Sequence, residues 1–598
     1  MKNKKTNRRR PPVKKRKRKS LLRRIWGSPR TTVVLSFLFL LSFSTAVYYH
    51  TQVYTIRKMV ERNFKNASPP PDVFLPEPEV PEAEVQQTAA TQEQLIWLET
   101  ATTLLEQNDG RMTAVMPRLY TSKEATILTF EGIGPADEIQ NVLGALRAKR
   151  SIATFFITRS QIETEMDALT QIVQAGHQIG LLIGEDIVSV TDFMCSMLDA
   201  REKLRLLYGY QGELDLRPVG GIASSAFLEG ACALGCPVIS ATFEATPETV
   251  WRLSEPETIC ETTLSEEMPS LQIGGIANFR MGVFTREGTL GNYVRYLLEE
   301  KSPYPAMSPG MILTDASLLY TWPLPENRIE TSIRDAIAPG QTTYANVLQR
   351  ITSGFIGMET HKKEEQLPGF TYLERDALNK RGTVPNENNQ VFLTFHGWGS
   401  DMCIQEVLDV LEKHNAYATF FLQTDGVARN PNLARAIAAA GHDVGTMTHT
   451  GLPLAIGLDD DTHYVEINDT EADALRADLM TSYDTLLHII GDMTNESGKP
   501  SLTRYFRPPD LAASRRGLEV AFDLGFTYCV FGSYDCGDDK AESVSDVLKD
   551  MRLNTKSGSV LILRISDDCP YTAEALDSYL TQVEENYYRF VELSKVLR

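Results

Sequence analysis

The sequence predicts an α/β protein in which two tandem domains of similar fold follow a single N-terminal transmembrane helix. Three observations lead to this prediction. One block of residues occurs twice, short apolar segments alternate with amphipathic segments inside each block, and a long uncharged stretch lies near the N-terminus. At 598 residues the chain is long enough for several domains.

The N-terminal region has the charge pattern of a membrane anchor. Residues 1–30 contain fifteen Lys or Arg and no acid, and the nineteen residues of Thr31–Tyr49 carry no charge. About 20 apolar residues cross a bilayer as a helix, and flanking basic residues keep their side in the cytoplasm. A cleaved signal peptide is the alternative, but no Ala-x-Ala site follows. We therefore predict a basic cytoplasmic tail (1–30), an anchor (31–50), and extracytoplasmic domains beyond it.

Composition then separates the anchor from the folded part. Residues 51–94 are rich in Pro and Glu, which favours an extended stalk over a packed core. Helical spacing over 91–107 marks the start of the folded part. A second polar segment, 361–390, is predicted to be a linker between domains at 95–360 and 391–598. Without the basic tail the formal charge of −18 becomes −33, and such a surface repels nucleic acid.

The eight cysteines permit disulfides but do not form a zinc-knuckle pattern. Four lie in each predicted domain, and no Cys-x-x-Cys pair occurs. Disulfides are allowed outside the cytoplasm. A cysteine within an apolar run, such as Cys529, is equally well explained as a buried free thiol.

The repeated block defines the two domains. Leu128–Gly180 aligns with Leu393–Gly445 without a gap, and 19 of the 53 positions carry the same residue. Each copy opens with Leu-Thr-Phe-x-Gly-x-Gly, continues with Ala-Thr-Phe-Phe and closes with Ala-Gly-His-x-x-Gly; an Arg-Pro pair follows at Arg217 and at Arg507. Because solenoid repeats span only about 20–50 residues, a spacing of 265 residues indicates two tandem domains.

Strands and helices alternate inside each block. Residues 126–130 are short, β-branched and followed by glycine, which is typical of a buried strand, and Ala153–Ile157 and Ala418–Leu422 have the same character. Apolar residues at helical spacing lie between them. This order implies parallel strands with helices packed outside. Functional groups in such folds gather at the carboxyl ends of strands, where Glu131–Gly134 and His396–Gly399 fall.

These motifs, in this order, resemble the polysaccharide deacetylase family, whose catalytic unit is the NodB-homology domain, a distorted (β/α) barrel. The resemblance covers most of both halves, so we expect two tandem distorted (β/α) barrels of the NodB-homology type. Members of the family hydrolyse N-acetyl groups of sugar polymers with a metal held by one Asp and two His. The resemblance therefore implies an envelope polysaccharide or a peptidoglycan-like glycan as partner.

The metal ligands of the family are largely missing here. The family opens with Thr-Phe-Asp-Asp-Gly, in which the second Asp binds the metal, and Gly132 and Gly397 stand at that position. The two histidine ligands should follow Ala-Gly-His-x-x-Gly, where the second copy has Met447 and Gly451 with His449 between them. A catalytic zinc normally needs three protein ligands. We therefore expect two degenerate copies without a cofactor.

The proton-transfer positions are altered as well. His396 stands where the family has its base, and Arg564 stands where it has a late histidine acid. A guanidinium does not release its proton near neutral pH. Arg507 and Asp535 match an Arg–Asp pair that supports the catalytic Asp in the family, and a purely structural ion pair is the simpler interpretation. These four residues are the candidates for a vestigial site.

Two alternatives concern the second copy. His396 and His449 could bind zinc or another divalent metal in a rearranged site, with Cys403, Asp535 or Cys536 as a further ligand, and so support an active hydrolase of N-acetyl or ester bonds. Trp398 is a candidate for substrate binding, since aromatic side chains stack on sugar rings, but it could equally be a packing residue.

The resemblance also implies that Cys536 and Cys569 follow neighbouring late strands, which predicts a disulfide between them. For the whole chain we expect a membrane-anchored, catalytically impaired pseudoenzyme that binds envelope carbohydrate. The rearranged hydrolase is one alternative. A scaffold whose paired domains bind envelope proteins is the other.

Overall fold

The computed structural model describes residues 92–597 except 185–186, 188, 342, 358–366, 379–381, 387, 459–462 and 584–586. The predicted tail, anchor and stalk therefore lie outside the described residues, apart from the last residues of the stalk. Among the residues that are described, no helix is both long and apolar enough to cross a membrane.

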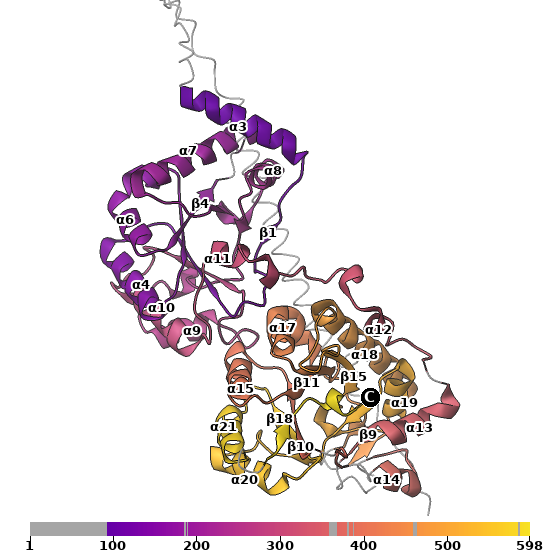
Figure 1. Cartoon of the computed structure of the whole chain (residues 1–598). Coiled ribbons are helices and arrows are strands. Elements are labelled where there is room, and N and C mark those ends of the chain that lie inside the picture. Colours follow the sequence, from indigo (N-terminus) through magenta and orange to yellow (C-terminus); the bar gives the residue numbers. More distant parts are fainter. Residues whose placement is uncertain are drawn as a thin grey trace, which may run out of the picture. The chain divides into compact units, whose positions relative to one another are not determined.

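The first domain contains α3, α4, α6 to α11, β1 and β4 as labelled in Figure 1, and it is built on an eight-stranded sheet. All neighbouring strands of this sheet are parallel, in the order β1-β6-β5-β4-β3-β2-β8-β7. Its strands are β1 (Val115–Met116), β2 (Ile127–Glu131), β3 (Thr154–Ile157), β4 (Gln178–Ile183), β5 (Asp215–Pro218), β6 (Val238–Ile239), β7 (Phe243–Glu244) and β8 (Ile276–Arg280). The helices of this domain are α3 (Gln92–Asn108), α4 (Ala136–Ala148), α5 (Gln161–Thr164), α6 (Met166–Gln174), α7 (Val190–Tyr208), α8 (Ser225–Ala233), α9 (Pro256–Thr263), α10 (Thr289–Glu300) and α11 (Pro309–Leu313).

The second domain repeats this order in the sheet β17-β18-β10-β11-β12-β15-β16-β9, which is again parallel throughout, with β19 beside β10. Its strands are β9 (Phe355–Ile356), β10 (Gln390–Gly397), β11 (Ala418–Leu422), β12 (Asp443–Thr446), β15 (Leu502–Phe506), β16 (Tyr528–Val530), β17 (Tyr534–Asp535), β18 (Val560–Arg564) and β19 (Arg589–Phe590), and β13 (Ile456–Gly457) pairs with β14 (Tyr464–Val465) in a separate antiparallel ribbon. The helices are α12 (Thr331–Arg334), α13 (Tyr344–Gly354), α14 (Tyr372–Leu378), α15 (Asp401–Lys413), α16 (Thr424–Arg429), α17 (Pro431–Ala439), α18 (Asp469–Ile490), α19 (Arg515–Leu524), α20 (Val544–Asn554) and α21 (Thr572–Val583).

The prediction of two similar parallel (β/α) sheets is thereby confirmed. In the first copy β2 lies between β3 and β8, and in the second copy β10 lies between β11 and β18. The apolar side chains of β2 and β10 are buried against the surrounding helices. Phe130 stacks on Phe155 in the first copy, and Phe395 stacks in the same way on Phe420 in the second. Among the described residues the hydrogen-bonded strands form an open series rather than a closed ring.

Each copy begins with a helix and a two-residue strand that the sequence block did not reveal. In the first copy α3 leads to β1, which pairs with β6. If the barrel strands are counted from β2, β6 is the fifth barrel strand. In the second copy α13 leads to β9, which pairs with the equivalent strand, β16. Helix α3 confirms the helix predicted over 91–107.

Side chains from before the predicted boundary at residue 360 also pack in the second domain. Leu324, Ile333 and Phe355 are buried in the core of the second domain, upstream of the predicted linker. Their apolar side chains fill space beside α18 and α19, and short apolar segments of this kind carry no periodicity from which a boundary could be drawn. The core of the second domain therefore includes side chains from before residue 360, such as Phe355 of β9.

The two domains belong to one compact unit and are joined by buried polar contacts. Asn432 on α17 donates to the carbonyl oxygens of Leu119 and Ile273 at 2.8 Å each, and its own carbonyl accepts from Thr121 N and Tyr320 Oη. The contact is fully satisfied, because an amide side chain has two donors and one acceptor atom with two lone pairs.

The predicted disulfide is wrong for this structure. All eight cysteines lie in the described residues, and all are free thiols. Cys536 is buried among apolar core residues of the second domain. Burial raises the pKa of the Cys403 thiol, and the nearby Asp567 and Cys569 raise it further.

Candidate functional site

A buried arginine is held in the same way at the carboxyl ends of the strands in both copies. Arg507 follows β15; its Nε donates to Val530 O at 2.9 Å, its Nη2 donates to Thr394 Oγ1 at 2.6 Å, and its guanidinium lies 4.5 Å from the ring centre of Phe421. Burial lowers the pKa of Arg507 to about 9, while Asp535 opposes this effect. The side chain therefore remains a cation at neutral pH.

The equivalent arginine of the first copy has equivalent partners. Arg217 donates through Nε to Ile239 O at 3.3 Å and through Nη2 to Thr129 Oγ1 at 2.9 Å, and it lies 4.2 Å from the ring centre of Phe156. In both copies the arginine of the Arg-Pro motif contacts a backbone carbonyl, a threonine hydroxyl and a phenylalanine ring at equivalent positions. These contacts join the first, second and fifth barrel strands, which are β2, β3 and β6 in the first copy and β10, β11 and β16 in the second.

His396 in the second copy is held in one tautomer by Arg507. Arg507 Nη1 lies 3.2 Å from His396 Nδ1. An arginine can only donate, so Nδ1 must accept and the ring hydrogen must sit on Nε2. Burial lowers the pKa of His396 well below its ordinary value, and the charges of Arg507 and Arg564 lower it further. His396 is therefore a neutral hydrogen-bond donor.

Arg564, at the end of β18, is bound by three carboxylates. Its Nη1 and Nη2 donate to the two oxygens of Asp535 at 2.9 Å each, Nη1 also donates to Asp538 at 2.8 Å, and Asp539 lies 3.2 Å away. Burial would raise the pKa of Asp535, but its hydrogen bonds and charge interaction with Arg564 outweigh burial and lower it. The resemblance implied an Asp535–Arg507 pair; the hydrogen bonds of Asp535 go to Arg564 instead.

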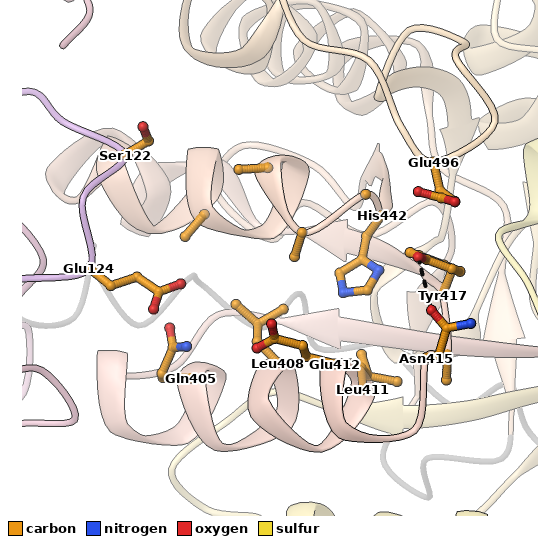
Figure 2. A pocket seen from close by; sticks show the side chains of 15 residues that line it. Ser122, Glu124, Gln405, Leu408, Leu411, Glu412, Asn415, Tyr417, His442 and Glu496 are labelled. Atoms are coloured by element: carbon orange, nitrogen blue, oxygen red, sulfur yellow. Dashed lines mark hydrogen bonds between the residues drawn. The ribbon is translucent and has the colours of Figure 1, made fainter. Parts of the chain in front are cut away.

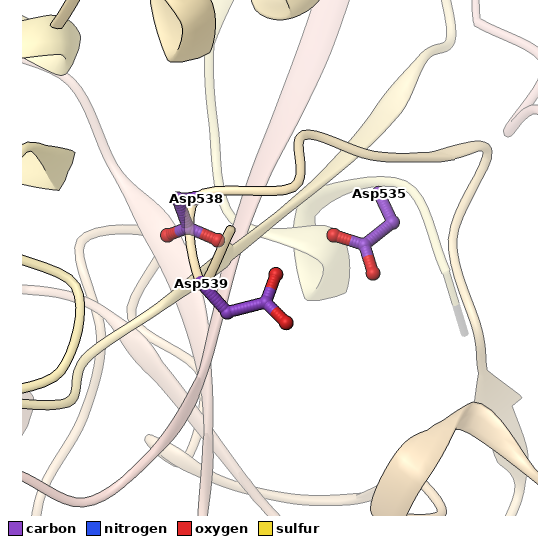
Figure 3. A group of neighbouring side chains, drawn as sticks. All are labelled: Asp535, Asp538 and Asp539. Atoms are coloured by element: carbon purple, nitrogen blue, oxygen red, sulfur yellow. The ribbon is translucent and has the colours of Figure 1, made fainter. Parts of the chain in front are cut away.

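These three aspartates are also the one group among the described residues that offers three potential metal ligands close together (Figure 3). The guanidinium of Arg564 already supplies the positive charge at their centre. A zinc site of the family kind does not fit these residues, because Gly397 has no ligand atom and Met447 is buried in an apolar cluster with Phe392 and Phe421.

The second histidine of the hypothetical rearranged site, His449, has its own set of partners. His449 follows β12, its Nδ1 lies 3.0 Å from Thr424 Oγ1, and its backbone N donates to Asp478 at 2.6 Å. It does not join His396 in any group of three ligands among the described residues. Trp398 is partly buried, and its indole lies against α16, where a Cβ added to Gly426 would come within 2.4 Å of Trp398 Cδ1. Trp398 is therefore partly packed against the core and partly exposed at the rim of the site.

The first copy carries a different set of groups at the same place. Asn278 Nδ2 donates to Glu131 at 3.2 Å and to Glu244 at 2.8 Å, and Arg217 and Thr129 both donate to Asn278 Oδ1. Glu131 replaces His396. Glu244 has the strand position of Asp535, since Glu244 pairs with Asn278 and Asp535 pairs with Ile562.

Sequence reasoning did not identify Asn278 or Glu244 as members of this cluster. Both lie outside the repeated block, on strands of two and five residues whose equivalence is visible only from the strand register. Glu244 directly follows Ser240-Ala241-Thr242-Phe243 and gave no signal of its own, whereas the Thr-Phe motif of the repeated block did mark the end of β2 and of β10.

Comparison with known proteins is consistent with two copies of one domain. The family model described as Polysaccharide deacetylase matches residues 119–181, in the first copy, and 383–529, in the second. These segments of both copies match the polysaccharide deacetylase family. Both copies of the NodB-type domain contribute to the match, as the duplicated sheets lead one to expect.

Curated relatives align with about one copy of the chain. One peptidoglycan-N-acetylglucosamine deacetylase of Bacillus cereus is 24% identical over 217 residues, which is 36% of this chain and 91% of the relative. A second from the same organism is 25% identical over 231 residues, covering 38% and 75%. A chitooligosaccharide deacetylase of a Bradyrhizobium species is 45% identical over 64 residues, covering 10% and 29%.

Among solved structures, the chain is similar to wild-type BA3943, described as a CE4 family pseudoenzyme from Bacillus anthracis. The identity is 22%, the match covers 36% of this chain and 66% of that chain, and the TM-score is 0.29. The Bc1960 peptidoglycan N-acetylglucosamine deacetylase matches at 23% identity over 36% of this chain and 90% of that chain, with a TM-score of 0.30.

Proposed function

We propose that this protein is a catalytically impaired deacetylase-family protein that binds envelope glycan from a membrane anchor. The observation that carries the proposal is the state of the two proton-transfer positions in the second copy. His396 and Arg564 stand at the base and acid positions of the family, and both are committed to other partners.

A general base needs a free lone pair directed at the proton that it removes. The lone pair of His396 Nδ1 accepts from Arg507, and Nε2 carries a hydrogen, so the ring can donate to a substrate but cannot take its proton. Arg564 is bound by Asp535 and Asp538 and does not release a proton near neutral pH. Hydrolysis of an amide would have to proceed without either partner.

The first copy supports the same proposal by a different route. Glu131 is a carboxylate at the base position, but Asn278 donates to it, and no ligand residue stands at Gly132. Asn278 holds the carboxylates of Glu131 and Glu244, which offer acceptors for hydroxyl and amide donors of a sugar. Binding of a sugar needs such donors and acceptors but no metal.

The glycan part of the proposal draws on the relatives, whose names describe action on peptidoglycan N-acetylglucosamine. The partly exposed Trp398 at the rim of the second copy is consistent with stacking on a sugar ring. The basic tail and uncharged stretch of residues 1–50 support an anchor that keeps both domains outside the cytoplasm.

The proposal is tested on the purified full chain with three measurements: metal content, acetate release from N-acetylglucosamine oligomers, and co-sedimentation with insoluble peptidoglycan. We expect sedimentation with the glycan and no acetate release above the background of a heat-denatured sample. Trp398→Ala should reduce the sedimenting fraction several-fold. The matched control is Trp97→Ala, since Trp97 lies on α3, which carries no residue of either candidate site.

The opposite result would establish the rearranged hydrolase instead. It would consist of one equivalent of tightly bound zinc together with acetate release, both lost in His396→Ala. Failure to sediment with any glycan, combined with capture of purified envelope proteins, would favour the scaffold alternative and contradict the glycan part of the proposal.

A further inference from the structure

The second domain contains a cavity of about 510 Å³ at the amino-terminal ends of β11 and β12, the end of the sheet opposite to the candidate site. Helices α15 and α17 form its walls, and Ser122 and Glu124 of the first domain contribute to its lining (Figure 2). Pockets of about 300–1,000 Å³ are the usual size for small-molecule ligands.

An unpartnered donor faces this cavity. His442, the histidine of Ala-Gly-His, is 1% exposed and lines the cavity beside Tyr417 and Glu496 (Figure 2). Its Nδ1 accepts from Ala418 N at 3.4 Å, so Nε2 carries the hydrogen, and among the described residues that buried Nε2 has no hydrogen-bond partner. Burial lowers the pKa of His442 to about 3, which keeps the ring neutral.

Leaving a buried donor without an acceptor costs roughly 1–3 kcal/mol. Native structures rarely retain such a group unless water, an ion or a ligand supplies the missing partner. A ligand oxygen placed in the cavity would accept from His442 Nε2 and remove that cost.

The cavity also concentrates negative charge. Glu124, Glu412 and Glu496 line it, and none of the three forms an ion pair among the described residues. Burial raises the pKa of Glu124, the neighbouring Asp409 and Glu412 raise it further, and Lys123 opposes them. A bound cation would relieve this repulsion.

Apolar side chains complete the lining. Leu408 and Leu411 are buried on the α15 side, and Ala436 faces them from α17. We propose that this cavity binds a hydroxylated primary amine of the glucosamine type. Its ammonium group lies among the glutamates, a hydroxyl or ring oxygen accepts from His442 Nε2, and its carbon skeleton contacts the leucines. The proposal is independent of the function proposed above, because it concerns the other end of the barrel.

The first copy offers an internal comparison. His177 lines a cavity of about 390 Å³ at the equivalent place, and its Nδ1 accepts from Ala153 N at 3.3 Å. Only one carboxylate, Glu213, lines that cavity. The histidine framework is therefore shared, whereas the cluster of three glutamates is particular to the second copy and accounts for its selectivity toward amines.

The test is a calorimetric titration of the full chain with glucosamine and with the β-1,4-linked glucosamine dimer, with N-acetylglucosamine as the uncharged comparison. We expect saturable binding of the amines, weakening of at least tenfold for N-acetylglucosamine, and weaker binding at high salt. The double variant Glu412→Gln/Glu496→Gln should lose at least tenfold in affinity. Glu406→Gln, on the same helix but outside the cavity, should bind as the wild type does.

A second measurement reports on His442 directly. In the NMR spectrum its Nε2 proton should shift when glucosamine binds, because the proton acquires an acceptor. Absence of saturable glucosamine binding, equal binding of N-acetylglucosamine, or an unchanged affinity in the double glutamate variant would each overturn the proposal. Binding without a shift of the His442 proton would also overturn it, since the ligand would then lie elsewhere.

Discussion

Arg564 and His396 show how two substitutions in one site reinforce each other. Arg564 and Arg507 both bring positive charge near His396. Both charges disfavour protonation of the imidazole, and Arg507 fixes its tautomer. A histidine that would titrate near neutral pH in water is converted into a neutral donor, and the aspartates that would otherwise attract a metal are neutralised by the same guanidinium.

A change at Arg564 should therefore be visible at His396. We predict that Arg564→Gln raises the pKa of His396, because one positive charge is lost and Asp535 is freed to favour the imidazolium. In the wild type, the lowered pKa means that this histidine contributes stability that is present above its unfolded pKa of about 6.5 and is lost as the pH falls toward the folded value. In the variant this loss should move toward higher pH and become smaller.

The measurement is the titration of the His396 imidazole by heteronuclear NMR between pH 4 and 8. Arg552→Gln removes a charge of the same kind from an exposed position at the end of α20 and serves as the control. An unchanged His396 titration in Arg564→Gln, with the control also unchanged, would show that Arg564 does not set the protonation state of this site.

The sequence was sufficient to place this arginine framework but not its pairing. Thr394 and Arg507 follow from the Thr-Phe and Arg-Pro motifs, and both lie at the carboxyl ends of their strands as expected. The motifs do not show which arginine binds Asp535, because that depends on how far the side chains of β17 and β18 extend toward each other. Asp535 is bidentate to Arg564, a contact between residues 29 positions apart that strand register alone decides.

The alternation of strands and helices predicted the central elements of both sheets. Ala418–Leu422 forms β11 with the predicted bounds, and 126–130 agrees with β2 to within one residue. The two leading strands were not predictable in the same way. Each is two residues long, so neither an alternation nor a buried run can be recognised, and their partner strands lie more than 100 residues later.

The role of β9 gives a prediction at this scale. Phe355 is fully buried and meets Phe531 edge to face at a ring-centre distance of 5.0 Å. We predict that Phe355→Ala lowers the free energy of unfolding of the second domain by about 3–5 kcal/mol, because it leaves a large cavity. Equilibrium denaturation monitored by tryptophan fluorescence measures the effect.

Leu373→Ala is the matched control, since Leu373 is 77% exposed on α14 within the predicted linker, and it should change the stability by less than about 0.5 kcal/mol. A loss below about 1 kcal/mol for Phe355→Ala would contradict a role of β9 in the stability of the second domain.

At the scale of the whole molecule, buried polar groups join the two domains. Asp401 is fully buried, accepts from Ile273 N at 2.9 Å and from Asn430 at 2.7 Å, and lies near Arg118, which donates to Asn430. Directional contacts of this kind specify one orientation, because a small shift would leave several buried groups unpaired.

Asn432 is the most connected residue of that contact. We predict that Asn432→Ala loosens the domains, since it leaves the carbonyls of Leu119 and Ile273 without their donor at a cost of about 2–4 kcal/mol in total. Hydrogen exchange at Thr121 N, which donates to Asn432, should accelerate at least tenfold. Asn292→Ala, an exposed change on α10, should leave that exchange rate unaltered, and protection that survives Asn432→Ala would contradict a role for this residue in holding the domains together.

In each copy a two-residue strand, β1 or β9, pairs with the fifth barrel strand, β6 or β16. During folding, β9 therefore has two equivalent strands with which it can pair. β9 emerges between the two barrels, and both β6 and β16 present the same kind of parallel edge to it. Pairing with β6 would exchange elements between the copies, the intramolecular form of a domain swap. The order of synthesis removes the choice, because β1 precedes the whole first barrel and already covers β6 when β9 leaves the ribosome. Refolding from denaturant has no such order, so the full chain should refold less faithfully than it folds during translation.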